Sequence, residues 1–274
     1  MSRAIPALTV LALLAPGCRL MEGIRNIREA VEGVTEPVVL GATAIGVSPP
    51  SDPRVAFALS QTELASGARL TAYLADASAA GSIEDAPITG EALSVRFAGG
   101  EIGLVEEEGG RYAASGADGF EYVAETLATV SLDGGQRSVE GALAPDPDFV
   151  APARHTPGAP IVVDLSGQDV DGVLVMVLDL VTGETVWENT PRDPMELFTF
   201  ATSGGASVVE VPGEVFETPG LFALGVAGTW NADSESVVGV NTALSSFFSA
   251  RFRFDVVCTL GDAALCAADP AEGL

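Results

Sequence analysis

The chain has 274 residues, of which 47% are hydrophobic and 19% charged, so it can fill the core of one large domain or two ordinary ones. It carries 13 basic against 38 acidic residues, a formal net charge of -25, and every basic residue is arginine. This charge repels the phosphates of nucleic acids, so we expect no nucleic-acid partner.

The N-terminus has the layout of an export signal. Arg3 is the only charged residue before Arg19, and residues 4–17, AIPALTVLALLAPG, are apolar or small. A membrane-spanning helix needs about 20 apolar residues. A short charged start, a short apolar run and then small residues are typical of a secretory signal. We therefore predict that residues 1–17 are a signal peptide.

The signal leads directly into a cysteine. Ala15, Pro16, Gly17 and Cys18 resemble the lipobox of bacterial lipoproteins, in which a leucine, two small residues and a cysteine direct cleavage and diacylglyceryl transfer; Ala15 stands in the leucine position. The resemblance implies lipidation of Cys18 and a place in the cell envelope. Arg19 is not the aspartate that retains many lipoproteins in the inner membrane, which implies the outer membrane, on either side. The alternative is ordinary signal cleavage with a free or paired cysteine.

The number of cysteines bears on the fate of Cys18. Of the three in the chain, Cys258 and Cys266 lie close together near the C-terminus and can pair in an oxidising compartment. One cysteine is then left over, as an acylated residue would be. A metal site is the competing interpretation of the pair, but no nearby histidine or third cysteine completes one. We predict a disulfide and no metal.

Residues 18–36 contain the anchor cysteine and a predicted amphipathic helix. Its apolar residues recur three or four positions apart, at Met21, Ile24, Ile27, Val31 and Val34. This pattern indicates a helix packed against the following domain. A stalk beside the membrane, or a strip that docks a partner, are the alternatives.

The rest of the chain predicts short strands separated by turn residues. In the first half the predicted strands span 38–47, 54–60, 68–76, 92–98, 102–108, 111–115, 125–133 and 136–143. In the second half they span 161–166, 173–181, 184–189, 197–202, 207–212, 220–230 and 247–257. Two pairs of residues, Gly134-Gly135 and Thr182-Gly183, predict hairpin turns because glycine adopts a positive φ easily.

A proline-rich stretch separates the two sets of strands. Residues 145–160 contain five prolines, which favour an extended, semi-rigid conformation. We therefore predict a first β-sandwich domain at 37–144, a linker at 145–160, a second β-sandwich domain at 161–258 and a C-terminal tail at 259–274.

Three stretches of the two halves carry a resemblance to a known kind of module: DLVTGETVW (179–187), VPGEVFETPGLFALGV (211–226) and GGRYAASGADGFEYVAETLATVSLDGG (109–135). The first two are similar to the hairpin and late-strand entry, and the third to the late hairpin, of the immunoglobulin-like and fibronectin-III-like modules of bacterial surface lipoproteins. The resemblance implies an all-β fold of two tandem sandwiches. It leaves the function open, since such folds host many functions.

Few residues point to catalysis. His155, the only histidine, lies in the predicted linker, where we expect it to be solvated. Nucleophilic triads need a positioned histidine, and Schiff-base chemistry needs a lysine, which the chain lacks. No phosphate-loop, zinc-protease or nucleophile-elbow motif occurs. We predict no catalytic residues, no enzyme activity and no cofactor.

Two groups of residues remain as binding candidates. Asp164, Asp169 and Asp171 form an acidic cluster that would suit calcium, although the EF-hand spacing is absent and a solvated loop is the alternative. Trp187 and Trp230 lie in or at the end of predicted strands, where most tryptophans belong to the core. If both were exposed on one face, stacking on a sugar or peptide would become plausible.

These observations predict a non-enzymatic, lipid-anchored envelope protein that acts in binding, adhesion or as a scaffold. Its expected partners are the membrane, through the N-terminal lipid, and another envelope protein or a surface polymer. One alternative is a carbohydrate-binding or carbohydrate-acting protein, favoured by an exposed tryptophan beside two carboxylates. The other is an accessory subunit of a surface or secretion assembly that adds a strand to a partner's sheet, favoured by a long uncapped edge strand.

Overall fold

The computed structural model describes residues 38–76, 86–107, 109–190, 200, 205–232, 237–241, 245–262 and 266. The chain divides into two compact units, residues 1–35 and 36–274, and the described residues all belong to the second. The predicted signal peptide, Cys18 and the amphipathic helix lie outside the described residues, as do most of the predicted strand at 197–202 and most of the tail. Within the described ranges, no helix has the length and apolar character needed to cross a membrane.

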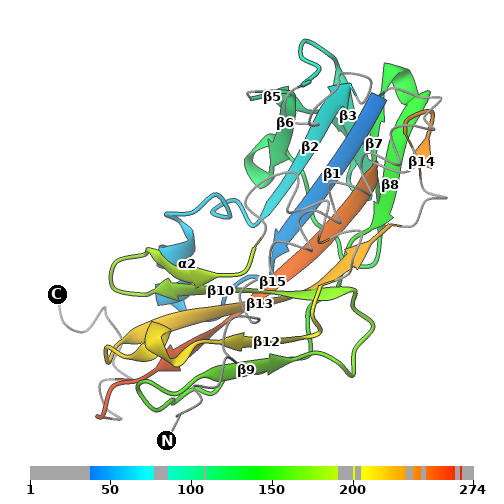
Figure 1. The fold of residues 1–274 in the computed structure, drawn as a ribbon. Coiled ribbons are helices and arrows are strands. Elements are labelled where there is room, and N and C mark those ends of the chain that lie inside the picture. Colours follow the sequence, from blue (N-terminus) through cyan, green and yellow to red (C-terminus); the bar gives the residue numbers. More distant parts are fainter. Residues whose placement is uncertain are drawn as a thin grey trace, which may run out of the picture. The chain divides into compact units, whose positions relative to one another are not determined.

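Strands dominate the described part of the chain, as the all-β prediction requires (Figure 1). The largest sheet has eight strands in the order β11-β10-β13-β15-β1-β2-β6-β5. These strands are β1 (Val38–Val47), β2 (Ala68–Asp76), β5 (Val105–Glu106), β6 (Arg111–Ser115), β10 (Gly172–Asp179), β11 (Thr185–Glu188), β13 (Leu221–Asn231) and β15 (Ser246–Cys258).

Two smaller sheets complete the strands of the described residues. A five-stranded sheet has the order β14-β8-β7-β3-β4, and a two-stranded sheet pairs β12 with β9. Their strands are β3 (Leu93–Phe97), β4 (Gly100–Gly103), β7 (Leu127–Leu132), β8 (Arg137–Ala142), β9 (Ile161–Asp164), β12 (Val208–Val211) and β14 (Val237–Val238).

Most predicted strands are confirmed. The bounds of β1, β2 and β6 are those that we predicted. Buried and half-buried positions alternate over most of β1 and β2, and glycines flank β6 on both sides. The predicted strand at 102–108 is divided between β4 and β5. Both predicted hairpin turns are present, and Gly134 and Gly183 adopt φ values of 66° and 76° there.

The predicted strand at 54–60 is wrong, because this segment forms the helix α2 (Pro53–Leu59). The side chain of Asp52 caps the helix by accepting the N–H of Arg54, and Pro53 occupies the first turn, where its missing N–H costs nothing. The buried positions follow one face of a helix and are Val55, Ala58 and Leu59. The Asp-Pro pair was the helix-start signal that the strand interpretation overlooked.

Strand β15 joins the two halves of the chain in one sheet. Along one edge it pairs in parallel with β1, from Gly41 opposite Ser246 onward, and along the other it pairs antiparallel with β13. Figure 1 shows β15 running between these two strands. The predicted domains at 37–144 and 161–258 therefore share a sheet, and the predicted boundary lies inside one compact unit. This corrects the expectation of two tandem β-sandwich domains separated by a linker.

Within the described residues, three hydrophobic clusters form the core, and β15 contributes to all of them. The first lies between the β1–β2 part of the large sheet and the five-stranded sheet and includes Phe247. The second lies between β10, β13 and the two-stranded sheet and includes Val257. The third includes Phe252 and packs against α2. Since side chains alternate along a strand, Phe252 lies on the face opposite to Phe247 and Val257.

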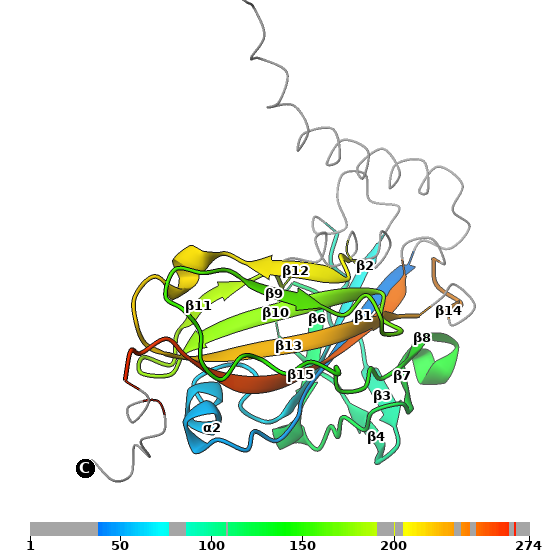
Figure 2. The same ribbon diagram turned by 90° about the horizontal axis from the view of Figure 1, so that it is seen from below.

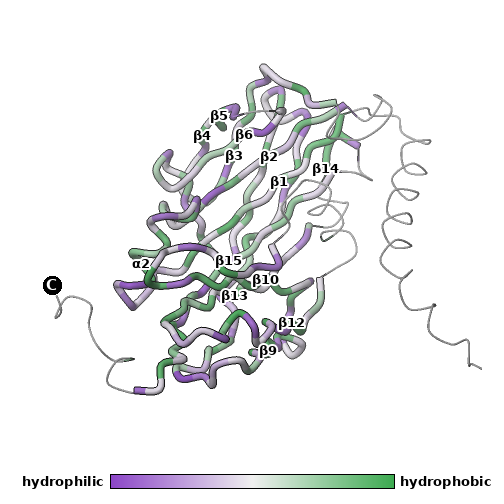
Figure 3. The backbone as a smooth tube through the Cα atoms, turned by 60° about the vertical axis from the view of Figure 1, so that its left-hand side comes forward, coloured by the Kyte–Doolittle hydropathy of each residue, from purple (hydrophilic) through white to green (hydrophobic). Residues whose placement is uncertain are grey.

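The figures show how these clusters are covered. In Figure 2, β9 and β12 lie on one side of β10, β13 and β15, and α2 lies on the other side. In Figure 3, hydrophobic residues follow the strands of the large sheet, whereas hydrophilic stretches gather in the turns. The sheet is therefore buried on both faces near β15.

The proline-rich segment lies along β15 and does not form a free linker. Just before the segment, the N–H of Ala144 donates to Ser249 Oγ at 3.0 Å, and within it Asp146 lies 3.1 Å from Arg251. Further along, the N–H of Ala151 donates to the Asp255 carboxylate at 3.2 Å, and the N–H of His155 donates to the Cys258 carbonyl at 2.9 Å. The residue numbers rise together along the segment and along β15, so the two run in the same direction. The prolines at 145–160 keep the segment extended, and β15 supplies its hydrogen-bond partners. The predicted linker is thus part of the folded unit.

Candidate functional site

The end of β15 is fixed by a disulfide, which confirms the predicted pairing of Cys258 with Cys266. Their Cα atoms lie 5.7 Å apart and their positions differ by 8 in the sequence. Closing a loop of this length stabilises the fold by about 2.5 kcal/mol in the chain-entropy model. The disulfide therefore holds the chain that follows β15 close to the end of the sheet.

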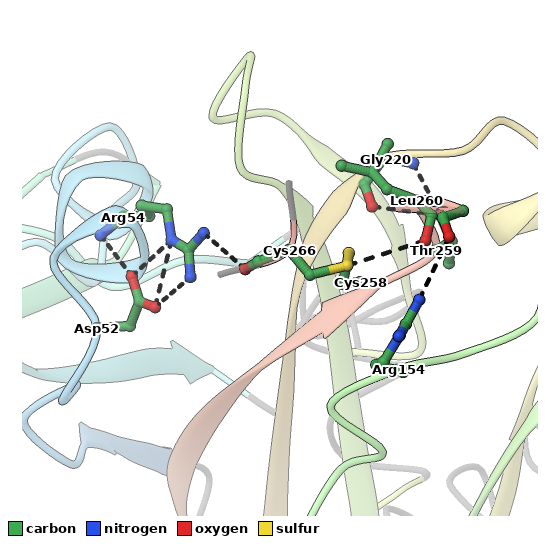
Figure 4. The surroundings of a disulfide bond; sticks show 9 residues. Asp52, Arg54, Arg154, Gly220, Cys258, Thr259, Leu260 and Cys266 are labelled. Atoms are coloured by element: carbon green, nitrogen blue, oxygen red, sulfur yellow. Dashed lines mark hydrogen bonds and ion pairs between the residues drawn. A yellow bond between two sulfur atoms is a disulfide. The ribbon is translucent and has the colours of Figure 1, made fainter. Parts of the chain in front are cut away.

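The start of helix α2 holds Cys266 from the other side (Figure 4). Arg54 Nη1 donates to the Cys266 carbonyl at 3.4 Å, and Arg54 Nη2 lies 2.6 Å from the Asp52 carboxylate. The side-chain hydrogen bond from Arg54 holds the pKa of Asp52 below its ordinary value. One carboxylate thus caps the helix and orients the arginine that contacts the disulfide loop.

Replacing Asp52 tests this link. We expect Asp52→Ala to lower the free energy of unfolding by about 1–2 kcal/mol, because it removes the helix cap and the partner of Arg54. Asp52→Asn keeps a capping oxygen and removes only the charge, so its effect should be smaller. Because the folded-state pKa is lowered, the charge stabilises the fold above the ordinary value of 3.8, and this contribution is lost as the pH falls through the folded-state pKa.

Urea denaturation at two pH values measures the effect. The difference between the unmodified chain and Asp52→Asn should be present at about pH 7 and should shrink as the pH falls through the folded-state pKa of Asp52. A difference of the same size at both pH values would contradict the role given to the charge.

An open pocket of about 470 Å³ lies next to the disulfide. Three segments form its walls, namely the end of the proline-rich segment, the turn before β13 and the residues after β15: Arg154, His155, Thr156, Pro157, Pro219, Thr259, Leu260 and Gly261. This volume falls in the range of about 300–1,000 Å³ that is usual for small-molecule sites. The docked segment and the disulfide loop together therefore create a concave surface.

His155 belongs to this wall, and the expectation that it is solvated is wrong. Its Nε2 lies 2.8 Å from the carbonyl oxygen of Ala159, and its ring packs edge-on against Phe216 with centroids 5.4 Å apart. A carbonyl oxygen only accepts hydrogen bonds, so Nε2 is the nitrogen that carries the proton. The only histidine of the chain is thus a half-buried structural side chain.

Arg154 brings a positive charge to the pocket. Among the described residues, Arg154 is the one arginine without a carboxylate within 4 Å of its guanidinium. Each of the other described arginines has such a partner: Arg54, Arg69, Arg96, Arg111, Arg137, Arg251 and Arg253. Its Nη2 contacts the Gly261 carbonyl at 3.5 Å, which is long for a hydrogen bond. Sequence reasoning did not single out Arg154, and the adjacent Arg-His pair was the only local signal.

The three calcium candidates do not converge on one point. The carboxylate of Asp164 accepts the N–H and the hydroxyl of Ser166 at 2.9 and 2.6 Å, and the hydroxyl lowers the pKa of Asp164. The carboxylate of Asp171 accepts the N–H of Asn231 at 2.7 Å. Across the described ranges, no group of three or more His, Cys, Asp or Glu side chains is placed to hold a metal ion. The hydrogen bonds of Asp164 and Asp171 instead stabilise the backbone of the loop that contains Asp169.

The two tryptophans are half-buried and do not form one platform. Trp187 lies on β11 opposite Val177 and packs against the second hydrophobic cluster. Trp230 is the penultimate residue of β13, and its Nε1 donates to the carbonyl of Asp169 at 2.7 Å. Val177, the partner of Trp187, also pairs with Leu224 of β13, so Trp187 lies level with Leu224 across the sheet. Trp230 lies 6 positions beyond Leu224 on β13, which corresponds to about 20 Å along the strand. The two tryptophans are therefore too far apart to contact one small ligand.

The described edge strands are short. The outer strands are β5 and β14 with two residues each, and β4, β9, β11 and β12 with four residues each. None of these is the long uncapped edge that strand addition to a partner would use.

Neither a scan against models of known protein families nor a search of curated proteins finds a match to this chain.

Proposed function

We propose that this chain is a lipid-anchored protein of the bacterial outer membrane that acts without catalysis, as a binding, adhesion or scaffold component. The observation that carries the proposal is the pairing of Cys258 with Cys266. It accounts for two of the three cysteines and leaves Cys18, directly after a signal-like sequence, as the odd one. A structural disulfide also suits an exported chain, since disulfides persist in oxidising compartments.

The absence of catalysis in this proposal is supported by the role of His155. Its Nε2 is bound to a backbone carbonyl and its ring packs against Phe216, so these contacts hold the imidazole in a structural position. Acid–base catalysis by histidine needs a ring nitrogen within reach of the reacting proton.

The two alternatives gain less support from the fold. A carbohydrate-binding or carbohydrate-acting protein would use Trp187 or Trp230 beside carboxylates, and Trp230 instead donates its indole N–H to the backbone of Asp169. An accessory subunit that adds a strand to its partner would need a longer edge than the four residues of β9, β11 or β12.

Metabolic labelling with an alkyne-tagged palmitate tests the anchor. The full chain should take up the label, and Cys18→Ala should lose it completely, because a thiol is needed for acyl transfer. The matched control is Cys258→Ala combined with Cys266→Ala, which removes two cysteines but should keep the label. Label that persists in Cys18→Ala, or that never appears in the unmodified chain, would contradict the proposal.

A further inference from the structure

The pocket beside the disulfide holds a charge that the described protein does not neutralise. Arg154 lines the pocket, and no carboxylate among the described residues lies within 4 Å of its guanidinium, although the chain contains 38 acidic residues. Its contact with the Gly261 carbonyl, at 3.5 Å, involves one of five N–H donors. The guanidinium is therefore available to an anion that enters the pocket.

The other polar side chains of the pocket add little positive charge. The hydroxyl of Thr259 accepts the N–H of Gly220 at 2.8 Å and lies 3.2 Å from the Gly220 carbonyl, so it is occupied by the backbone. His155 uses Nε2 for the Ala159 carbonyl, and its other ring nitrogen is an acceptor in the neutral form. Arg154 is thus the main anion-binding group of this surface.

A single guanidinium in this pocket selects the class of anion. It matches a carboxylate, which carries one charge and accepts two parallel N–H bonds. A dianionic phosphate would keep one charge without compensation. A polyanion would be repelled by the net charge of -25. Pro157, Pro219 and Leu260 form apolar walls around the arginine, and such walls favour an apolar group next to the carboxylate.

We propose that this pocket binds the carboxylate of a small ligand whose adjoining group is apolar and uncharged. Arg154 forms the charge-assisted bonds to the carboxylate, and the two prolines and Leu260 contact the apolar group. The disulfide and the contact between Arg54 and Cys266 hold the wall that follows β15 in place. Binding in this pocket does not depend on acylation of Cys18. The carboxylate site and the proposed lipid anchor can therefore be tested independently of each other.

Saturation-transfer NMR on the full chain in detergent tests the site with N-acetyl-leucine as the probe. N-acetyl-leucine should give a saturable signal, whereas N-acetyl-leucinamide, which has the same shape without the charge, should bind at least about tenfold more weakly. Arg154→Gln should weaken binding of N-acetyl-leucine by at least about tenfold, since a hydrogen bond to a charged group is lost. Arg96→Gln, at an exposed position of the five-stranded sheet, should leave it unchanged.

A second variant keeps the test decisive if Arg154→Gln is poorly folded. Leu260→Glu places a carboxylate in the pocket and should also abolish the signal. Peptides that end in leucine, with a free or an amidated C-terminus, distinguish a peptide source from a free acid. The proposal would be overturned if N-acetyl-leucine and N-acetyl-leucinamide bound equally well. It would also be overturned if inorganic phosphate bound as tightly as N-acetyl-leucine, or if none of the probes gave a saturable signal.

Discussion

The substitution Phe247→Ala is expected to lower the free energy of unfolding by about 3–5 kcal/mol, the usual cost of removing a buried aromatic ring. Phe247 is fully buried at the start of β15 and belongs to the first hydrophobic cluster. Its ring lies against Gly141 of β8, where an added Cβ would collide with it. The ring thus fills the space between the large sheet and the five-stranded sheet, and alanine would leave a cavity there.

Chemical denaturation followed by circular dichroism measures this effect. The control is Phe57→Ala, the same change at a side chain that is 62% exposed on α2. It should alter the free energy of unfolding by no more than about 0.5 kcal/mol. Equal effects of the two substitutions would contradict the position that we assign to Phe247 in the core.

Neither half of the chain is expected to fold alone, because β15 belongs to the same sheet as β1. A fragment of residues 37–144 would lose the parallel neighbour of β1 and the ring of Phe247, and it would expose the face that Phe247 covers. A fragment of residues 145–274 would leave the β1-facing edge of β15 unpaired over Ser246–Phe252. Such an edge is a template for aggregation.

Urea titration of both fragments and of the unit that contains residues 36–274 tests this expectation. The intact unit should unfold in one cooperative transition, whereas the fragments should show no sigmoidal transition or should be insoluble. A fragment of residues 37–144 that unfolds cooperatively would show that the first half is an independent domain, as the proline-rich stretch had suggested.

The local structure was predictable where side-chain alternation is regular. The bounds of β1, β2 and β6 follow from the pattern of apolar residues and from flanking turn residues. Helix α2 was missed because seven residues are too few to show a helical period, and only Asp52 and Pro53 marked its start. Strand β14 has two residues and carries no pattern.

The long-range arrangement was not predictable from such patterns. The parallel pairing of β1 with β15 joins residues about 200 positions apart, and alternation within a strand does not specify its neighbour. The prolines of 145–160 correctly indicated an extended segment. They did not indicate that this segment is hydrogen-bonded along β15, because its partners lie about 100 positions further along the chain.

The candidate site was predictable only in part. The disulfide followed from the number and spacing of the cysteines. The pocket did not, because Arg154, Pro219 and Leu260 come from three segments that meet only in the folded chain. The acidic cluster and the tryptophans were singled out by residue type, and the fold places them in local hydrogen bonds and half-buried positions.

Anchoring through Cys18 is tested most directly by the mass of the N-terminal peptide of the mature protein, isolated from the membranes of the native cells. We predict a peptide that begins at Cys18 and carries a thioether-linked diacylglyceryl group. A lipid-free N-terminus at or downstream of Cys18, with the protein recovered in the soluble fraction, would contradict the envelope anchor and with it the proposed function.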